Sequence, residues 1–291
     1  MSRTRSGGSG GFIVFLLVCA LLYAVQTNAT VRAKVGELVA WGWNGGPAPT
    51  VTVTTPTALP SLPPLPGSLP SNTAPVPSVD PVRLDQALAT LNALPVRERV
   101  KDQAYDRSCS PGHACSFGPA WSDDQSAPDG HNGCGTRDDV LKEQLVSPAL
   151  KDGSRCVVVA GALTDPYTGA TVQFAKAQAD AVQIDHVYPL SLAFDQGANG
   201  WSLDKRMAFA NDTALNLLAT AGPVNNFKSD MTAAQWLTAK QPANKTTQVI
   251  MTDPGRKCFY GTKYVAVAAA YGLPITPADK AALTAAFAAC R

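Results

Sequence analysis

Val182-Gln-Ile-Asp-His-Val187 begins with alternating apolar and polar residues, and this period of two predicts a short strand. Pro189 cannot donate to a strand ladder, so we expect the strand to end before it and residues 190–194 to form a helical turn. A second strand is predicted over residues 215–219. Neighbours on a regular strand point to opposite faces, so Asp185 and His186 can share one site only at a strand end or a bulge.

Helix and strand signals surround this segment without a regular alternation. A hairpin is predicted from the β-branched run at 156–160, the turn Asp165-Pro-Tyr-Thr-Gly169 and the returning run at 171–174. Because strands and helices mix without βαβ units, the predicted class is α+β. Helices are predicted from Pro81 to Pro95, from a capping box at Thr136 to Asp139 up to about Leu145, from Ser202 to Ala210, from Thr232 with Gln235, from Cys258 to Tyr271, and from Thr276 to Cys290.

The first 80 residues differ in composition from the rest of the 291-residue chain. Arg3 and Arg5 precede an apolar run over residues 12–25, so residues 1–29 are predicted to be a signal peptide or an N-terminal membrane anchor. A permanent span needs about 20 apolar residues, which is more than this run provides. We therefore expect an exported protein, extracellular or associated with the cell envelope, with residues 12–25 as its candidate anchor.

A linker and one domain account for the remaining residues. Residues 30–80 predict an extended Pro/Thr-rich linker, because 11 of the 23 prolines lie between residues 47 and 81. Residues 81–291 are long enough for one sizeable core. From residue 83 onward, 20 Lys and Arg residues balance 20 Asp and Glu residues. Nucleic-acid binders usually carry a basic excess, so any phosphate binding here must depend on local placement of charge.

Six cysteines follow the apolar run, and an even number in an exported chain favours disulfide bonds. Six cysteines allow fifteen connectivities. A zinc site is the alternative, although the sequence has no Cys-x2-Cys or His-x3-His spacing. We expect pairs that are local in sequence, namely Cys109–Cys115, Cys134–Cys156 and Cys258–Cys290.

Asp185, His186, Asn216 and Asn225 form the candidate chemical set. Asp185 offers a hard oxygen ligand, and His186 offers a base whose ordinary pKa is about 6.5. The asparagines offer neutral oxygens that can orient the base or complete a metal site. Hydrolysis of a phosphodiester needs an activated water and a cation, so this set predicts a one-metal phosphodiesterase. The structural alternative is an ordinary hydrogen-bonded Asp–His pair with asparagines in turns.

The chain resembles the HNH, or ββα-metal, endonucleases over roughly residues 105–290. Within them it is most similar to the small exported bacterial HNH proteins related to the C-terminal domain of the GmrSD restriction enzyme. The matching motifs are Gly133-Cys-Gly-Thr-Arg137, Val140-Leu141, Asp165-Pro-Tyr-Thr-Gly169, Ile184-Asp-His-Val-Tyr-Pro-Leu190, Gly197-Ala, Trp201, Arg206, Phe209-Ala-Asn-Asp212, Leu215-Asn-Leu-Leu218, Asn225-x-x-Lys228, Trp236-Leu237 and the tail from Cys258 to Cys290.

The resemblance implies a ββα-metal core embedded in surrounding helices and stapled by disulfides, with residues 81–291 as the nuclease domain. It implies that His186 is the general base, that Asp185 and Asn225 bind the metal, and that Asn216 supports the base and its loop. Asn225 stands in the place of the last His of the HNH name. An amide oxygen suits Mg²⁺ or Mn²⁺ better than Zn²⁺, so a hard divalent cation is the expected cofactor.

Substrate contacts are predicted from the same motifs. Lys228 and Arg137 are candidate phosphate contacts, whereas Asn226 occupies a position where the family often has a basic residue. For the larger aromatic residues core packing is favoured over stacking on bases, and the remaining two histidines are expected at the surface. These residues are Trp121, Trp201, Trp236, Tyr167, His113 and His131.

The resulting hypothesis is a monomeric, metal-dependent endonuclease that acts on nucleic acid, DNA rather than RNA, and touches a membrane only through its N-terminal segment. The alternative is a catalytically inactive, envelope-associated module that keeps the fold to bind nucleic acid or protein. The balanced charge of residues 83–291 and Asn226 motivate this alternative. A metallopeptidase is disfavoured because the sequence has no His-Glu-x-x-His motif.

Overall fold

The computed structural model describes residues 81–290. The predicted leader and linker, residues 1–29 and 30–80, lie outside the described residues. The strands are β1 (Val146–Leu150), β2 (Val158–Thr164), β3 (Thr171–Ala175), β4 (Val182–His186) and β5 (Leu217–Ala221). The helices are α3 (Pro81–Ala93), α4 (Thr136–Gln144), α5 (Leu190–Asp195), α6 (Leu203–Ala210), α7 (Gly222–Lys228), α8 (Ala233–Leu237), α9 (Pro254–Tyr271) and α10 (Pro277–Ala288), with 3-10 turns η1 (Lys176–Ala181) and η2 (Ala198–Gly200). The predicted α+β class is therefore confirmed.

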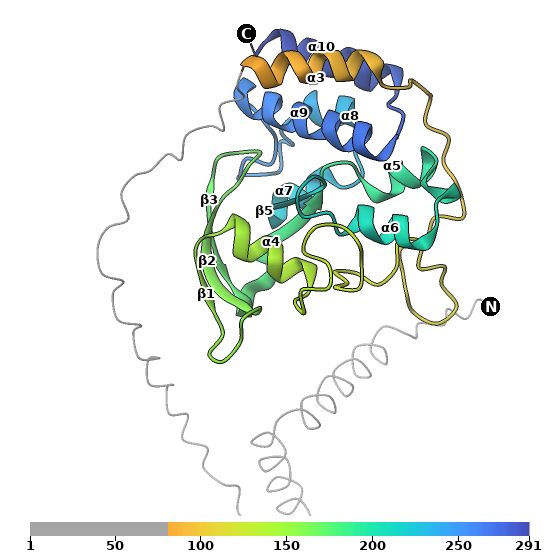
Figure 1. The fold of residues 1–291 in the computed structure, drawn as a ribbon. Coiled ribbons are helices and arrows are strands. Elements are labelled where there is room, and N and C mark those ends of the chain that lie inside the picture. The colour runs from red at the N-terminus through yellow and green to blue at the C-terminus, as the bar shows by residue number, and fades with distance from the viewer. Residues whose placement is uncertain (1–80, 291) are drawn as a thin grey trace, which may run out of the picture. The chain divides into compact units, whose positions relative to one another are not determined.

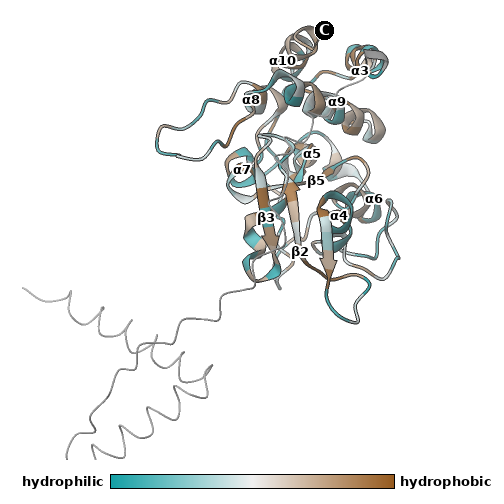
Figure 2. Ribbon diagram, turned by 90° about the vertical axis from the view of Figure 1, so that its left-hand side faces the viewer, coloured by the Kyte–Doolittle hydropathy of each residue, from teal (hydrophilic) through white to brown (hydrophobic). Residues whose placement is uncertain are grey.

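Two separate antiparallel sheets make up the strand part of the fold (Figure 1). The first has the order β1-β2-β3, and its β2–β3 hairpin is the predicted one. The turn between these strands closes where Gly169 N donates to the Asp165 carbonyl at 2.8 Å. Gly169 has a φ of +78°, which a residue without Cβ adopts at no steric cost. Figure 2 shows hydrophobic residues along β2 and β3, the strands that cover the smaller core.

The second sheet pairs β4 with β5, with Asp185 opposite Leu218 and His186 opposite Leu217. The strand predicted at residues 215–219 begins two residues late, because a turn holds its first two residues. In that turn Leu215 N donates to Asp212 Oδ1 at 2.9 Å and Asn216 N to the Asp212 carbonyl at 3.0 Å. α7 follows β5 directly and packs on both strands. The order is therefore two antiparallel strands and then a helix.

The β4–β5 pair lies between two hydrophobic cores. The larger core contains the buried faces of α3, α8, α9 and α10, which pack together in the upper part of Figure 1. The smaller core joins α4 to both sheets through residues such as Val140, Phe174 and Leu217. Ile184 belongs to the smaller core and Val187 to the larger one, so the chain passes from one core to the other at Asp185 and His186. Fully buried side chains on both sides therefore fix the end of β4.

Helix caps agree with the sequence at three positions and differ at one. Ser202 caps α6, and Thr232 and Thr276 form capping boxes for α8 and α10. The capping box predicted at Thr136 is wrong, because Gly135 is the N-cap of α4. Thr136 Oγ1 instead donates to the Ser122 carbonyl at 2.9 Å. A tertiary contact has replaced the local cap.

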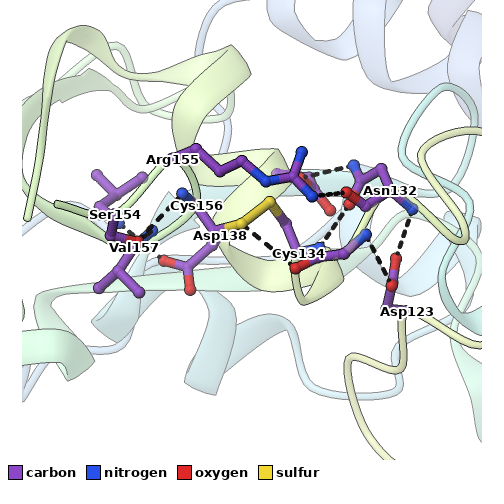
Figure 3. The surroundings of a disulfide bond; sticks show 11 residues. Asp123, Asn132, Cys134, Asp138, Ser154, Arg155, Cys156 and Val157 are labelled. Carbon is purple, nitrogen blue, oxygen red and sulfur yellow. Dashed lines mark hydrogen bonds between the residues drawn. A yellow bond between two sulfur atoms is a disulfide. The ribbon is translucent and has the colours of Figure 1, made fainter.

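Three disulfide bonds join Cys109 to Cys115, Cys134 to Cys156, and Cys258 to Cys290, the local pairs expected from sequence order. Figure 3 shows the Cys134–Cys156 bond, which attaches the loop before α4 to the loop before β2. Asp123 accepts hydrogen bonds from Asn132 N at 3.0 Å and Gly133 N at 2.9 Å on one side of it. On the other side Asp138 Oδ1 accepts from Val158 N at 3.0 Å.

Within the described range, residues 81–290, every helix is too short or too polar to cross a lipid bilayer. The candidate anchor at residues 12–25 lies outside this range.

Candidate active site

Asp185 is buried at the end of β4 and both of its carboxylate oxygens accept hydrogen bonds. Lys228 Nζ lies 2.9 Å from Oδ1, and the Tyr167 hydroxyl donates to Oδ2. Lys228 is 0% exposed and also donates to the His186 carbonyl at 3.0 Å. Burial raises the pKa of Asp185, while the Lys228 charge and the hydrogen bonds from Tyr167 and Lys228 oppose that rise. The Asp185 carboxylate is therefore held in a fixed position.

His186 is the last residue of β4, and its ring is held by two contacts. Nε2 donates to the Ala210 carbonyl at 2.9 Å, and the ring stacks on Trp121 with centroids 5.8 Å apart. A carbonyl oxygen only accepts, so Nε2 carries the proton of the neutral ring and Nδ1 keeps its lone pair. Burial and the charges of Arg107 and Lys228 lower the pKa of His186 to about 3. The imidazole is therefore neutral at physiological pH.

Asn216 is fully buried and connects β4 to the end of α6. Its Oδ1 accepts from Tyr188 N at 2.9 Å, and its Nδ2 donates to the Phe209 carbonyl at 3.2 Å. Phe209 precedes Ala210, whose carbonyl holds His186. The Asn216 backbone carbonyl accepts from Val187 N at 2.9 Å. Asn216 thus contacts the chain segments on both sides of His186.

Asn225 lies on α7 and lines a cavity of about 380 Å³ together with Asp185 and His186. Its Nδ2 donates to Gln183 Oε1 at 2.8 Å, and Oδ1 has no partner among residues 81–290. The cavity brings three of the predicted site residues to one place, because His186 is the last residue of its strand. The other lining residues are Tyr105, Arg107, Ile184, Pro189, Leu190, Ser191, Asn226, Ser229 and Asp230.

The cavity contains oxygen donors of the kind that hard divalent cations accept. Asp185 and Asn225 offer oxygens, and Mg²⁺ commonly binds through one or two protein oxygens with waters and substrate phosphates. Within residues 81–290 no group of three or more His, Cys, Asp or Glu side chains is placed to hold a metal. Lys228 already contacts Asp185 at 2.9 Å, so a cation bound at Asp185 would have to share or replace that contact.

The two residues predicted to contact phosphate do not line this cavity. Lys228 is engaged with Asp185 and the His186 carbonyl, and its contact with phosphate stays a prediction. Arg137 donates to the carbonyls of Ala179 and Val182 at 3.0 and 2.8 Å, so it secures η1 and the start of β4. Both cations satisfy buried or half-buried acceptors that are distant in sequence, a role that sequence spacing does not reveal.

Several residues of the site were missed or interpreted as structural. Asp165 is 0% exposed and accepts from Thr168 N at 2.7 Å and from Ala221 N at 2.7 Å, which ties the β2–β3 turn to β5. Tyr167 in that turn then reaches Asp185. The sequence predicts a turn at this motif and matches it to the family, but it does not predict the contact with Asp185. Arg107 lines the cavity and was not singled out, because its segment has no regular periodicity.

The aromatic and histidine predictions are confirmed, and Trp121 packs against the smaller core as a half-buried residue. Trp236 and Tyr167 are buried in the larger core, Trp201 packs on Phe209 and Tyr271, and His113 and His131 are exposed. Trp121 is half-buried, lies against His186 and has a φ of +58°. A bulky residue in the left-handed region is strained, and such strain is common at functional sites.

Comparison with known proteins assigns the family of this domain. A model of the C-terminal domain of GmrSD restriction endonucleases matches residues 135–286, which is more than half of the chain. The chain belongs to that family. The match contains Asp185, His186, Asn216 and Asn225, and it ends before Cys290. The resemblance to this branch, expected from the motifs, is therefore confirmed.

One curated relative is described as an uncharacterized secreted protein of Arthroderma benhamiae. It is 35% identical over 152 residues, which cover 52% of this chain and 65% of the relative. The matched region of the chain thus spans slightly less than two thirds of the length of that relative. No solved structure gives a significant match.

Proposed function

We propose that this protein is a metal-dependent endonuclease that hydrolyses phosphodiester bonds, with DNA as its substrate and His186 as general base. The observation that carries the proposal is the arrangement of His186, which lines the cavity and whose Nε2 is bound to the Ala210 carbonyl, so that Nδ1 keeps its lone pair. Membership of a restriction-endonuclease family supports the nuclease class. The β4–β5–α7 order supports the proposal that this segment is the ββα-metal core.

His186 would accept a proton from the attacking water at Nδ1. The hydrogen bond from Nε2 to the Ala210 carbonyl fixes the ring and becomes stronger when the ring is protonated, because the donor is then cationic. Asn216 holds the chain around that carbonyl. General-base catalysis of this kind contributes about 10²- to 10⁴-fold to the rate. The lowered pKa ensures that the base is unprotonated at neutral pH.

Asp185 and Asn225 would hold the divalent cation, Mg²⁺ or Mn²⁺. When bound, the cation neutralises charge on the phosphate and on the leaving oxygen. Tyr167 orients the Asp185 carboxylate by donating to Oδ2, and Lys228 balances its charge in the absence of a cation. The amide of Asn225 is oriented by Gln183, which accepts from Nδ2. The protein therefore prepares both donors before substrate arrives.

Export and the domain organisation belong to the same proposal. Residues 1–29 would direct export or anchor the chain, residues 30–80 would be a spacer, and residues 81–291 would be a monomeric nuclease domain. The disulfide bonds suit an oxidising compartment, and the relative described as secreted supports export.

A plasmid-nicking assay with Mg²⁺ or Mn²⁺ tests the function. We expect the full chain to nick and linearise plasmid, EDTA to abolish cleavage, and His186→Ala to reduce the rate by at least about 100-fold. A substitution at the exposed His131 serves as the matched control, because it removes an imidazole that lines neither cavity. Plasmid cleavage that persists in EDTA and in the His186→Ala variant would refute the proposal.

The inactive binding module has one structural observation in its favour. The Lys228–Asp185 ion pair already balances the charge of the site. That alternative predicts no metal-dependent cleavage, and it predicts that nucleic-acid or protein binding is unchanged in His186→Ala.

A further inference from the structure

Arg107 is a cation of the cavity whose guanidinium has no protein partner within residues 81–290. It is exposed and lines the cavity that also contains Asp185, His186 and Asn225. Arg107 and His186 also line a second, smaller pocket beside Trp121. Arg107 therefore lines both of the cavities that His186 lines.

The other charges around the cavity are paired. Lys228 is bonded to Asp185 at 2.9 Å. Asp230 lies 3.2 Å from Arg99, which also pairs with Asp195 at 2.6 Å. A phosphate entering the cavity would thus meet Arg107 as its available positive group among the described side chains.

The segment that carries Arg107 is held in place by its neighbours. Asp106 accepts from Ser108 N at 3.0 Å and from His113 Nδ1 at 2.7 Å, and Ser116 N donates to the Asp106 carbonyl at 2.8 Å. The Cys109–Cys115 bond closes the loop between these contacts. A guanidinium on a fixed backbone loses less conformational entropy when it binds a ligand, and its donors match phosphate oxygens in pairs.

We propose that Arg107 binds a phosphate of the nucleic-acid backbone beside the bond attacked at His186, in the place that Lys228 and Arg137 do not fill. This inference rests on the proposed nuclease function. Its electrostatic effect already reaches the imidazole, because the Arg107 charge is one cause of the lowered pKa of His186. Arg107 is thus a substrate-binding residue, and it acts on DNA affinity before it acts on the chemical step.

The test is DNA binding by the full chain in EDTA, measured by fluorescence anisotropy with a short labelled duplex at several salt concentrations. All proteins carry His186→Ala so that the duplex stays intact. We expect Arg107→Gln to weaken binding by about tenfold and to lower the slope of log affinity against log salt by about one. Arg83→Gln is the matched control, because Arg83 is an exposed arginine on α3 that lines neither cavity.

The failure of this inference can be separated from failure of the proposed function. If wild-type protein cuts plasmid but Arg107→Gln binds DNA with the affinity and salt slope of Arg83→Gln, the phosphate contact is wrong and the nuclease function stands. If wild-type protein neither binds nor cuts DNA, both proposals fall. A selective loss in Arg107→Gln supports the contact even before the metal is identified.

Discussion

The imidazole of His186 and the indole of Trp121 are stacked, with 13° between their planes and 5.8 Å between their centroids. Trp121 adopts a φ of +58°, so the fold tolerates backbone strain at the residue that stacks on His186. An aromatic pair of this kind contributes about 0.5–1.5 kcal/mol beyond the area that it buries. The stacking therefore limits the ring rotation that the Ala210 hydrogen bond alone would permit.

We expect Trp121→Ala to lower kcat by about tenfold with little change in KM, because the ring is less well oriented while substrate contacts remain. Trp121→Phe should keep most of the activity, since a flat ring remains over the imidazole. The pKa of His186, followed by NMR, should rise toward its ordinary value in Trp121→Ala. Equal kcat in wild type and Trp121→Ala would refute a positioning role.

The acid limb of the cleavage rate should lie below pH 6.5, the ordinary pKa of histidine, because the His186 pKa is lowered to about 3.

The lowered pKa of His186 also affects the stability of the fold. Between these two values the unfolded chain binds a proton that the folded chain rejects, so the folding stability contributed here is complete above pH 6.5 and is lost as pH falls. Urea unfolding of wild type and His186→Gln at pH 7 and pH 5 measures the effect. A similar pH dependence in both proteins would contradict it.

Asn216→Ala should destabilise the fold by about 1–3 kcal/mol, because it leaves Tyr188 N and the Phe209 carbonyl buried without their partner. Asn216→Asp keeps the acceptor for Tyr188 N but places a buried carboxylate oxygen opposite the Phe209 carbonyl, so it should destabilise the fold as well. Urea unfolding gives the stability, and the cleavage rate gives the effect on His186. If Asn216→Ala is as stable as wild type, the connection between β4 and α6 does not depend on this side chain.

Lys228→Met should cost about 3–5 kcal/mol, because removing one partner leaves the Asp185 carboxylate buried without its counter-charge. Mg²⁺ or Mn²⁺ should then raise the Tm of this variant more than that of wild type, since a cation at Asp185 replaces the ammonium. Lys142→Met, at an exposed position on α4, is the control. Equal metal-induced shifts in all three proteins would argue against Asp185 as a ligand.

Loss of the Cys134–Cys156 bond should cost about 3 kcal/mol, as expected for a loop of this size. The double substitution to Ser should lower the urea midpoint, and reductant should lower it further only to the extent that the other two bonds contribute. A variant as stable as wild type would mean that the hydrogen bonds of Asp123 and Asp138 hold these loops on their own.

The parts of the fold that were predictable from sequence depend on local signals. Pro189 ended β4, Ser202 and Thr232 capped their helices, and His186 fell at a strand end as the shared site required. One error has a tertiary cause and the other a local one. Thr136 bonds to Ser122, which lies outside the helix it was expected to cap. Asp212 holds the residues that were assigned to the start of β5.

The same division applies to the candidate site. Asp185, His186 and Asn225 reach one cavity, and the motifs identified all three. Lys228 looked like a phosphate contact because neither spacing nor composition reveals that its ammonium lies 2.9 Å from Asp185. Arg107 escaped notice because it lies in a segment without helical or strand periodicity. The partners of charged side chains depend on which distant residues the fold brings together. Helix caps and strand ends depend mostly on residues nearby in sequence.

The Cys258–Cys290 bond determines where an expression fragment can be cut. The family match ends at residue 286, so a fragment trimmed to it would keep Cys258 as an unpaired thiol. α9 would then lose its covalent link to the end of α10. This helix also carries Arg256, which donates to the carbonyls of Asp165 and Pro166 in the turn that contains Tyr167. A trimmed fragment would also lack Trp121, which precedes residue 135. The smallest unit suitable for recombinant work is therefore longer than the region by which the family is detected.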